Sequence, residues 1–277
     1  MPTAIHMEDV SVLRHGQTKP ILRQLSLNVQ SGQWVALCGQ NGAGKTTLAR
    51  TLLGLCPIAA GRIRIHGHDV KEATAQQIQM VFQPPMAQLV GSTLYEELAL
   101  TLVQRFPAIN TADLLHQISD ICQLVGLNVP IDASVHALSG GQLQRLCIAQ
   151  ALLSGAEVLL LDEASAALDA DARNQLRHLL RELVKQGKTI LFISHDMEDV
   201  LAADRVVLLA DGGIVQDCHP ADFFYDAQGT DCPARDFGFA PPFLVETALM
   251  YNRLERQHIK PCSESAFVEA LAHVVRT

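Results

Sequence analysis

The segment GQNGAGKTT at residues 39–47 limits the possible folds more than any other part of the chain. It fits the pattern GxxxxGK followed by Ser or Thr, which requires a buried strand before it and a helix after it. The apolar run Trp34–Cys38 precedes it, and a helical pattern, Thr46–Leu55, follows. In this arrangement backbone N–H groups converge on phosphate oxygens at the positive end of a helix dipole. The segment therefore predicts a phosphate-binding loop.

The side chains of this loop predict how a nucleotide is held. Gly39, Gly42 and Gly44 allow the backbone to close around phosphates. Lys45 is suited to the β and γ phosphates, and Thr46 to Mg²⁺. The predicted nucleotide-binding set also includes Gln40, Asn41, Ala43 and Thr47. A glycine-rich turn can be purely structural, but the complete pattern between a strand and a helix favours nucleotide binding.

Further apolar runs predict the fold class. The segments EVLLLDE, KTILFISH and DRVVLLADGG, which begin at residues 157, 188 and 204, are continuously apolar, as are strands covered on both faces of a mostly parallel sheet. IHMEDVSVLR and LSLNV, which begin at residues 5 and 25, alternate apolar and polar residues, as in an antiparallel sheet. We therefore predict an α/β fold with a parallel core and an antiparallel β subdomain.

Helical spacing and prolines predict two additions to this core. Between about residues 92 and 155, Leu, Ile and Ala recur at helical spacing, which indicates an inserted helical subdomain. After Asp217 several prolines interrupt the chain, and helical patterns follow at 243–256 and 264–275. We expect a main domain at residues 1–229 and a small helical C-terminal extension at residues 230–277.

Composition excludes several other classes of protein. The 7 cysteines are never spaced CxxC, which argues against a disulfide framework or a zinc site. No signal-peptide pattern is present, and no apolar run approaches the roughly 18 residues that span a bilayer. The net charge of −8 argues against broad nucleic-acid binding. We expect any membrane contact to be made through a protein partner.

Polar residues at the ends of predicted strands indicate hydrolysis. Asp162 and Glu163 end an apolar run, where Asp162 is suited to hold Mg²⁺ and Glu163 to polarise the attacking water. His195 directly follows a second predicted strand and can reach the γ phosphate. Gln83 directly follows a third predicted strand and can contact Mg²⁺ or the water. The alternatives are a helix cap for the acids, a cap or packing role for His195, and an ordinary polar role for Gln83. A kinase is disfavoured because the chain has no obvious motif for an acceptor substrate, and a small GTPase because it has no guanine-reading NKxD motif.

Two further motifs are LSGGQ at 138–142 and AALD at 166–169. With these two included, the motifs and their order resemble the ATP-binding subunit of ABC transporters from residue 3 to about residue 225. The resemblance implies ATP and Mg²⁺ as cofactors and an ABC ATP-binding domain over residues 1–229. It also implies a Walker A motif at Gly39–Thr47, a Q-loop at Gln83, a signature at Leu138–Gln142, a Walker B motif at Leu159–Asp162 with catalytic Glu163, a D-loop at Ala166–Asp169, and the switch His195.

The LSGGQ segment adds a second phosphate site. Ser139 and Gln142 fit a capping box, which needs no ligand, while Gly140 and Gly141 leave helix amides facing outward. The two roles are compatible. Because the signature lies on the helical subdomain, away from the chain's own phosphate loop, the fitting anion is the γ phosphate of ATP on a second subunit.

A narrower resemblance concerns the energy-coupling-factor ATPases, which drive vitamin and transition-metal uptake. It is carried by HPADFF at 219–224, FGFAPPFLVETALMYNRL at 237–254, SESAFVEAL at 263–271 and the Q-loop region at 81–100. It implies a second ATP-binding subunit, identical or related, a membrane-embedded coupling subunit whose helix enters the Q-loop groove, a substrate-binding membrane subunit, and a peripheral location at the cytoplasmic face of the cell membrane.

Other members of the ABC superfamily give the alternatives. The chain could serve another class of ABC transporter. A soluble ABC ATPase acting on DNA or translation is disfavoured by the acidic charge and by the absence of a long coiled-coil insertion. A module that binds ATP without turnover is disfavoured by the intact catalytic residues. One departure from the family concerns adenine stacking, where Arg14 and His15 stand in place of the usual aromatic residue; an arginine or imidazole can still stack on a base.

Overall fold

Two β-sheets form the centre of the computed structural model, which describes residues 2–13 and 19–276. The strands of the larger sheet are β3 (Trp34–Gly39), β6 (Ile78–Val81), β7 (Val158–Asp162), β8 (Thr189–Ile193), β9 (Arg205–Ala210) and β10 (Gly213–Cys218). Their order is β10-β9-β3-β8-β7-β6, and every neighbouring pair is parallel except β9 and β10.

The smaller sheet is antiparallel. Its strands are β1 (Thr3–Leu13), β2 (Pro20–Gln30), β4 (Ala60–Ile65) and β5 (His68–Asp69), in the order β2-β1-β4-β5. Strand β1 has buried residues at alternating positions along much of its length, including Ile5, Met7, Val10 and Val12. This pattern is the one that the sequence predicts for a sheet with one covered face.

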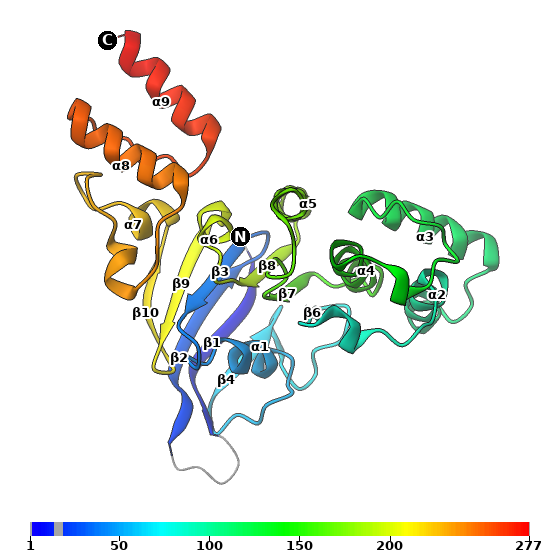
Figure 1. Cartoon of the computed structure of the whole chain (residues 1–277). Helices are drawn as coiled ribbons and strands as arrows, with labels where there is room; N and C mark the ends of the chain where they lie inside the picture. The colour runs from blue at the N-terminus through cyan, green and yellow to red at the C-terminus, as the bar shows by residue number, and fades with distance from the viewer. Residues whose placement is uncertain (1, 14–18, 277) are drawn as a thin grey trace.

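Helices lie on both sides of these sheets (Figure 1). The α-helices are α1 (Lys45–Leu52), α2 (Leu94–Arg105), α3 (Thr111–Val125), α4 (Gly140–Leu153), α5 (Ala170–Lys185), α6 (Met197–Ala202), α7 (Pro220–Phe224), α8 (Phe243–Glu255) and α9 (Glu264–Arg276), and the 3₁₀ helices are η1 (Pro85–Gln88), η2 (Val135–Ala137) and η3 (Pro233–Phe237). Helix α1 ends at Leu52 rather than at the predicted Leu55, because Gly54 turns the chain with a φ of +71°.

Strand β3 divides the two hydrophobic cores. All 6 of its residues are buried. Trp34 and Ala36 join the core beneath helices α2, α4 and α5, whereas Val35 and Leu37 join the core shared with the smaller sheet. Each large apolar side chain buried in this way contributes about 1.5–3 kcal/mol relative to an exposed one. The predicted α/β fold, with a parallel core and an antiparallel β subdomain, is confirmed.

Helices α2, α3 and α4 occupy the stretch where the sequence predicts a helical insertion, and they group on one side of the sheets (Figure 1). Thr93 caps α2 by accepting a hydrogen bond from the Glu96 N–H, and Asn110 caps α3 through the Asp113 N–H. Their buried leucines and isoleucines pack in one core with the larger sheet. The insertion is therefore held by apolar packing onto the sheet that carries the candidate site.

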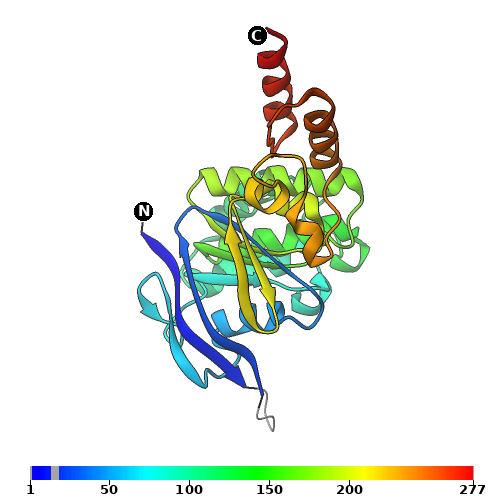
Figure 2. The same ribbon diagram turned by 90° about the vertical axis from the view of Figure 1, so that its left-hand side faces the viewer.

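Helices α8 and α9 project from the sheets beyond α7 (Figures 1 and 2). Buried Asn252 of α8 fastens the adjoining loops, because its amide donates to the carbonyls of Gly229 at 2.7 Å and Ile259 at 2.8 Å. The Tyr225 hydroxyl donates to the Pro261 carbonyl at 2.8 Å. Within the described residues, none of the helices combines the length and the apolar character needed to span a bilayer.

Candidate nucleotide-binding and hydrolysis site

The loop between β3 and α1 has a backbone that only glycine fits at two positions. Gly39 has a φ of +149°, and a Cβ atom there would lie 2.3 Å from the Leu209 carbonyl oxygen. Gly44 has a φ of +107°, and its Cβ would lie 2.8 Å from Cδ2 of Leu22. Gly44 is also the N-cap of α1, so the helix begins without a side-chain cap. The first amides of α1 are thereby left for an anion at the positive end of the dipole.

Lys45 lies inside this loop. Its Nζ donates to the carbonyls of Gly39 at 2.7 Å and Gln40 at 3.1 Å, and the residue is 7% exposed. Burial lowers the pKa of the ammonium group, while the nearby Glu163, Cys38 and Asp162 act in the opposite direction. A cation held at the mouth of a loop of backbone amides suits the charge of nucleotide phosphates.

Thr46 and Asp162 meet between α1 and the end of β7. Burial raises the pKa of Asp162, while the neighbouring Thr46 hydroxyl acts to lower it. A hydroxyl and a carboxylate are oxygen ligands that Mg²⁺ accepts together with phosphates and water. No cluster of three or more His, Cys, Asp or Glu residues in the described chain could hold a metal alone.

Glu163 and His195 face each other at the same sheet edge. Nε2 of His195 lies 3.3 Å from Oε1 of Glu163, and both side chains are partly exposed. Glu163 has a φ of +50°, and its N–H donates to the Ile193 carbonyl at 2.9 Å. Because this bond joins the residue after β7 to the end of β8, the two side chains are placed by neighbouring strands rather than by a flexible loop.

Gln83 comes two positions after the end of β6, which is the strand next to β7. The sequence places Gln83 directly after a strand, but β6 ends at Val81 and Phe82 lies between them. The Gln83 side chain is exposed at the edge where Asp162 ends β7 and Glu163 follows it. The parallel order β3-β8-β7-β6 thus brings the phosphate loop, His195, the acidic pair and Gln83 to one carboxyl edge, where ligands of open α/β sheets bind.

The signature segment lies elsewhere. Ser139 and Gln142 form the predicted capping box, with the Ser139 N–H donating to Oε1 of Gln142 at 2.8 Å and the Gln142 N–H donating to the Ser139 hydroxyl at 3.3 Å. Gly140 and Gly141 open α4, which stands apart from α1 (Figure 1). The structure therefore does not bring this helix start to the chain's own phosphate loop. Arg14 and His15, the predicted adenine contacts, lie outside the described residues.

One wall of the site comes from residues 238–242, which carry part of the family resemblance but are not predicted from the sequence to be part of the site. A cavity of about 580 Å³ is lined by Glu163, Arg173 and His195 on one side and by residues 238–242 on the other. A second cavity, of about 340 Å³, places Asp236, Phe237 and Phe239 opposite residues 40–43. The run FGFAPP contains no charged or metal-ligating residue, so only the docking of α7 and η3 onto the sheet could have placed it here.

Arg173 is the other functional candidate that sequence reasoning missed. A signal for it exists, because Arg173, Arg177 and Arg181 recur at a spacing of four along α5 and each pairs with an aspartate between residues 196 and 204. The spacing alone is also typical of a solvated helix face. Which carboxylate each arginine meets depends on how α5 packs beside α6.

A phosphate loop and an acidic strand end on one parallel sheet define a P-loop nucleotide-binding protein. The family model described as ABC transporter matches residues 22–166. The energy-coupling factor transporter ATP-binding protein EcfA1 of Ligilactobacillus salivarius is 35% identical over 225 residues, covering 79% of each chain. EcfA1 of Halalkalibacterium halodurans is 33% identical over 246 residues, covering 87% of each. The chain belongs to the ABC transporter family, among the energy-coupling factor ATP-binding proteins.

Solved structures agree with this assignment. CbiO1 from Clostridium perfringens, described as part of the ABC transporter complex CbiONQ, superposes with a TM-score of 0.74 at 25% identity over 81% of this chain and 91% of that one. A dimeric ATP-binding cassette in a post-hydrolysis state with ADP and Pi gives a TM-score of 0.71 at 23% identity, covering 78% of this chain and 98% of that one. The second likeness supports the fold.

Proposed function

We propose that this chain is the ATP-hydrolysing subunit of an energy-coupling-factor importer, and that it couples MgATP binding, dimerisation and hydrolysis to the uptake of a vitamin or a metal ion. The observation that carries the proposal is the meeting of Lys45, Asp162, Glu163 and His195 at one sheet edge. It is supported by the names of relatives that match most of the chain.

The phosphate loop and the end of β7 form the binding half of the site. The amides of residues 39–47 and the ammonium of Lys45 hold the phosphates of ATP. Thr46, Asp162 and Gln83 are the residues that would hold Mg²⁺. When bound, the metal ion neutralises charge that develops on the transferred phosphoryl group.

Glu163 and His195 form the catalytic half. Glu163 accepts a proton from the attacking water, and His195 orients that water and the γ phosphate. Their separation of 3.3 Å allows both side chains to contact one small molecule. Lys45 and Asp162 are partly removed from water, so their electrostatic interactions with the reacting phosphate are stronger than they would be in water.

The signature completes a second subunit's site. Ser139, Gly140, Gly141 and Gln142 present a helix start with outward amides, which suits a γ phosphate held by the phosphate loop of the partner. The capping box keeps this helix start in one conformation. Hydrolysis therefore requires two ATP-binding subunits, identical or related.

A groove beside the Q-loop is the proposed contact with the membrane. It has a volume of about 440 Å³ and is lined by residues that include Gln79, Phe82, Gln88, Arg105 and Gln150. Its mixed apolar and amide lining suits a helix of a membrane-embedded coupling subunit, which in turn carries the substrate-binding membrane subunit. In this assembly the chain is peripheral, at the cytoplasmic face of the cell membrane.

Purification of the tagged chain from its own cells after mild detergent extraction tests the proposal. We expect a polytopic membrane protein to copurify, and the mass of the complex to show whether the second ATPase is identical or related. Vesicles containing the complex should take up a nutrient when ATP is supplied, and the Glu163→Gln complex should retain the membrane protein without ATP-driven uptake. Recovery of the native chain without any membrane protein would contradict the transport role.

A further inference from the structure

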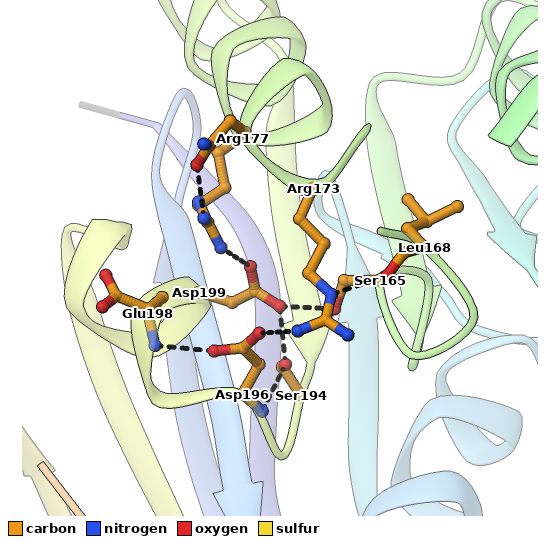
Figure 3. Close-up of polar contacts among 9 residues, drawn as sticks. Ser165, Leu168, Arg173, Arg177, Ser194, Asp196, Glu198 and Asp199 are labelled. Atoms are coloured by element: carbon orange, nitrogen blue, oxygen red, sulfur yellow. Dashed lines mark hydrogen bonds and ion pairs between the residues drawn. The ribbon is translucent and has the colours of Figure 1, made fainter. Parts of the chain in front are cut away.

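Buried Asp199 of α6 joins three segments around the catalytic edge (Figure 3). Its carboxylate accepts hydrogen bonds from the hydroxyls of Ser165 at 2.5 Å and Ser194 at 2.8 Å, and it pairs with Arg177 of α5 at 2.9 Å. The Asp199 side chain is 1% exposed. Ser165 follows Glu163 and Ser194 precedes His195, so one buried carboxylate fixes the chain next to each of the two residues proposed to catalyse hydrolysis.

Arg173 makes a second connection at the surface of this network (Figure 3). Its Nε donates to the Leu168 carbonyl at 2.9 Å, and its Nη1 donates to Oδ2 of Asp196 at 3.0 Å. The other Asp196 oxygen accepts from the Glu198 N–H at 2.9 Å and begins α6. One guanidinium therefore holds both the D-loop, Ala166–Asp169, and the residue directly after His195.

The D-loop also lies beside the signature helix of the same chain, with no room between them for more than a methyl group. A Cβ atom at Gly141 would lie 3.7 Å from Cδ2 of Leu168 and 3.8 Å from Cβ of Ala172. Leu168 itself is buried, with 7% of its surface exposed. The start of α4 therefore lies beside Leu168, and hydrogen bonds continue from Leu168 through Arg173 to Asp196.

We infer that Arg173 is a positioning residue that couples the D-loop to the switch histidine, so that His195 is held opposite Glu163 only while the D-loop is seated against the signature helix. The inference rests on the proposed function. In a dimer, the signature serves the partner's ATP and His195 serves the chain's own. Arg173 therefore connects the two ATP sites within one subunit.

The chemistry of arginine explains why this position needs it. A guanidinium presents several N–H donors in a rigid plane, so it can reach a carbonyl and a carboxylate at the same time. A lysine has one flexible ammonium group, which at this position keeps the charge but holds the two loops together less firmly. Substitution by lysine therefore separates the role of the charge from the role of the connection.

Arg181 offers a matched control on the same helix. Its Nη1 pairs with Oδ1 of Asp204 at 2.5 Å, and its Nη2 donates to the Ala202 carbonyl. Its side chain is 34% exposed, against 37% for Arg173. It joins α5 to the segment after α6 with the same two kinds of acceptor, but it does not line the cavity that contains Glu163 and His195.

The test compares Arg173→Ala and Arg173→Lys with Arg181→Ala and Arg181→Lys in the intact complex. Both Arg173 variants should lose about tenfold or more in kcat, since displacement of a catalytic group by about 1 Å can cost up to about 100-fold. Their KM for ATP and the Kd of ATP should stay within about twofold of the native values, because the phosphate loop is untouched. The Arg181 variants should keep the native kcat per folded molecule. Full kcat in Arg173→Lys, or equal losses in the two alanine variants, would overturn the inference.

Hydrogen exchange gives a readout that does not depend on turnover. In Arg173→Ala, peptides covering residues 163–169 and 194–199 should lose protection together, whereas Arg181→Ala should leave both protected. Unchanged exchange in Arg173→Ala would refute the connection even if hydrolysis is slow. A native complex that does not hydrolyse ATP would instead contradict the proposed function and leave the exchange experiment valid.

Discussion

Nε2 of His195 lies 3.3 Å from Oε1 of Glu163, and these residues follow the neighbouring parallel strands β8 and β7. The hydrogen bond from the Glu163 N–H to the Ile193 carbonyl fixes the same pair of strand ends through the backbone. An acid and an imidazole so placed can share one water molecule, which is the arrangement that general-base hydrolysis requires.

Glu163→Gln should lower ATP turnover by at least about 100-fold, because the amide cannot accept the proton of the attacking water. Binding should persist, since Lys45 and the loop amides are unchanged, so ATP should still raise the Tm and hold two subunits together. Glu157→Gln is the matched control at the other end of β7, where Glu157 pairs with His66 at 3.2 Å. Steady-state hydrolysis and gel filtration with ATP measure both effects. Retained hydrolysis in Glu163→Gln would refute the catalytic role.

Ser139→Ala should impair hydrolysis far more than ATP binding. Loss of the cap costs about 1 kcal/mol of stability, and the partner's γ phosphate loses a contact. Thr93→Ala removes the equivalent cap of α2, where the Thr93 hydroxyl accepts from the Glu96 N–H at 3.2 Å, and it controls for stability. We expect kcat to fall by about tenfold or more in Ser139→Ala alone. A monomer that hydrolyses ATP at the full rate would contradict the two-subunit site.

Local sequence patterns were sufficient for the parts of the site built from one segment. The loop of Gly39–Thr47 needs particular φ angles within a few residues, and the capping box joins residues three apart. A short sequence motif is therefore enough to predict each of them. The strand ends could be predicted for a related reason. Continuous apolar runs indicate parallel strands, and parallel strands bring their carboxyl ends to one edge.

Contacts between distant segments could not be predicted in this way. The pairing of Arg173 with Asp196 depends on how α5 packs beside α6, and the approach of Phe239 to the site depends on α7, where Phe223 and Phe224 are both fully buried. Apolar side chains carry little information about which distant surface will cover them, because the hydrophobic effect is non-directional.

Gly39→Ala should destabilise the protein more than Gly187→Ala. Both positions have positive φ, of +149° and +90°, which alanine rarely adopts. At Gly187 the added methyl group meets nothing within 4 Å, whereas at Gly39 it meets the Leu209 carbonyl oxygen at 2.3 Å. Thermal unfolding should show the larger loss for Gly39→Ala, and ATP titration should show loss of binding for that variant alone. Equal losses of Tm would refute the steric argument.

Asp162 provides a prediction in which activity and stability change in opposite directions. Burial raises the pKa of this carboxyl above its ordinary value, which means that folding disfavours the charged form. A group whose pKa is raised by folding stabilises the protein only in its protonated state. This contribution is complete below the ordinary carboxyl pKa and is lost as the pH rises through the raised pKa.

Asp162→Asn should therefore raise the Tm at neutral pH in the absence of nucleotide and Mg²⁺, while it lowers Mg²⁺-dependent hydrolysis. In a chain of this size each 1 kcal/mol of stability corresponds to about 2–4 °C in Tm, and the gain should shrink as the pH falls and the native carboxyl becomes protonated.

Asp226→Asn is the control, and its Tm should change in the opposite direction. Burial acts to raise the pKa of Asp226, but hydrogen bonds from the backbone N–H groups of Asp231, Thr230 and Gly229 lower it overall. This variant should lose Tm at neutral pH, and the loss should disappear in acid as the native carboxyl is protonated. A neutral-pH loss of Tm in Asp162→Asn would show that the charged form of Asp162 stabilises the empty site, contrary to the effect of its burial.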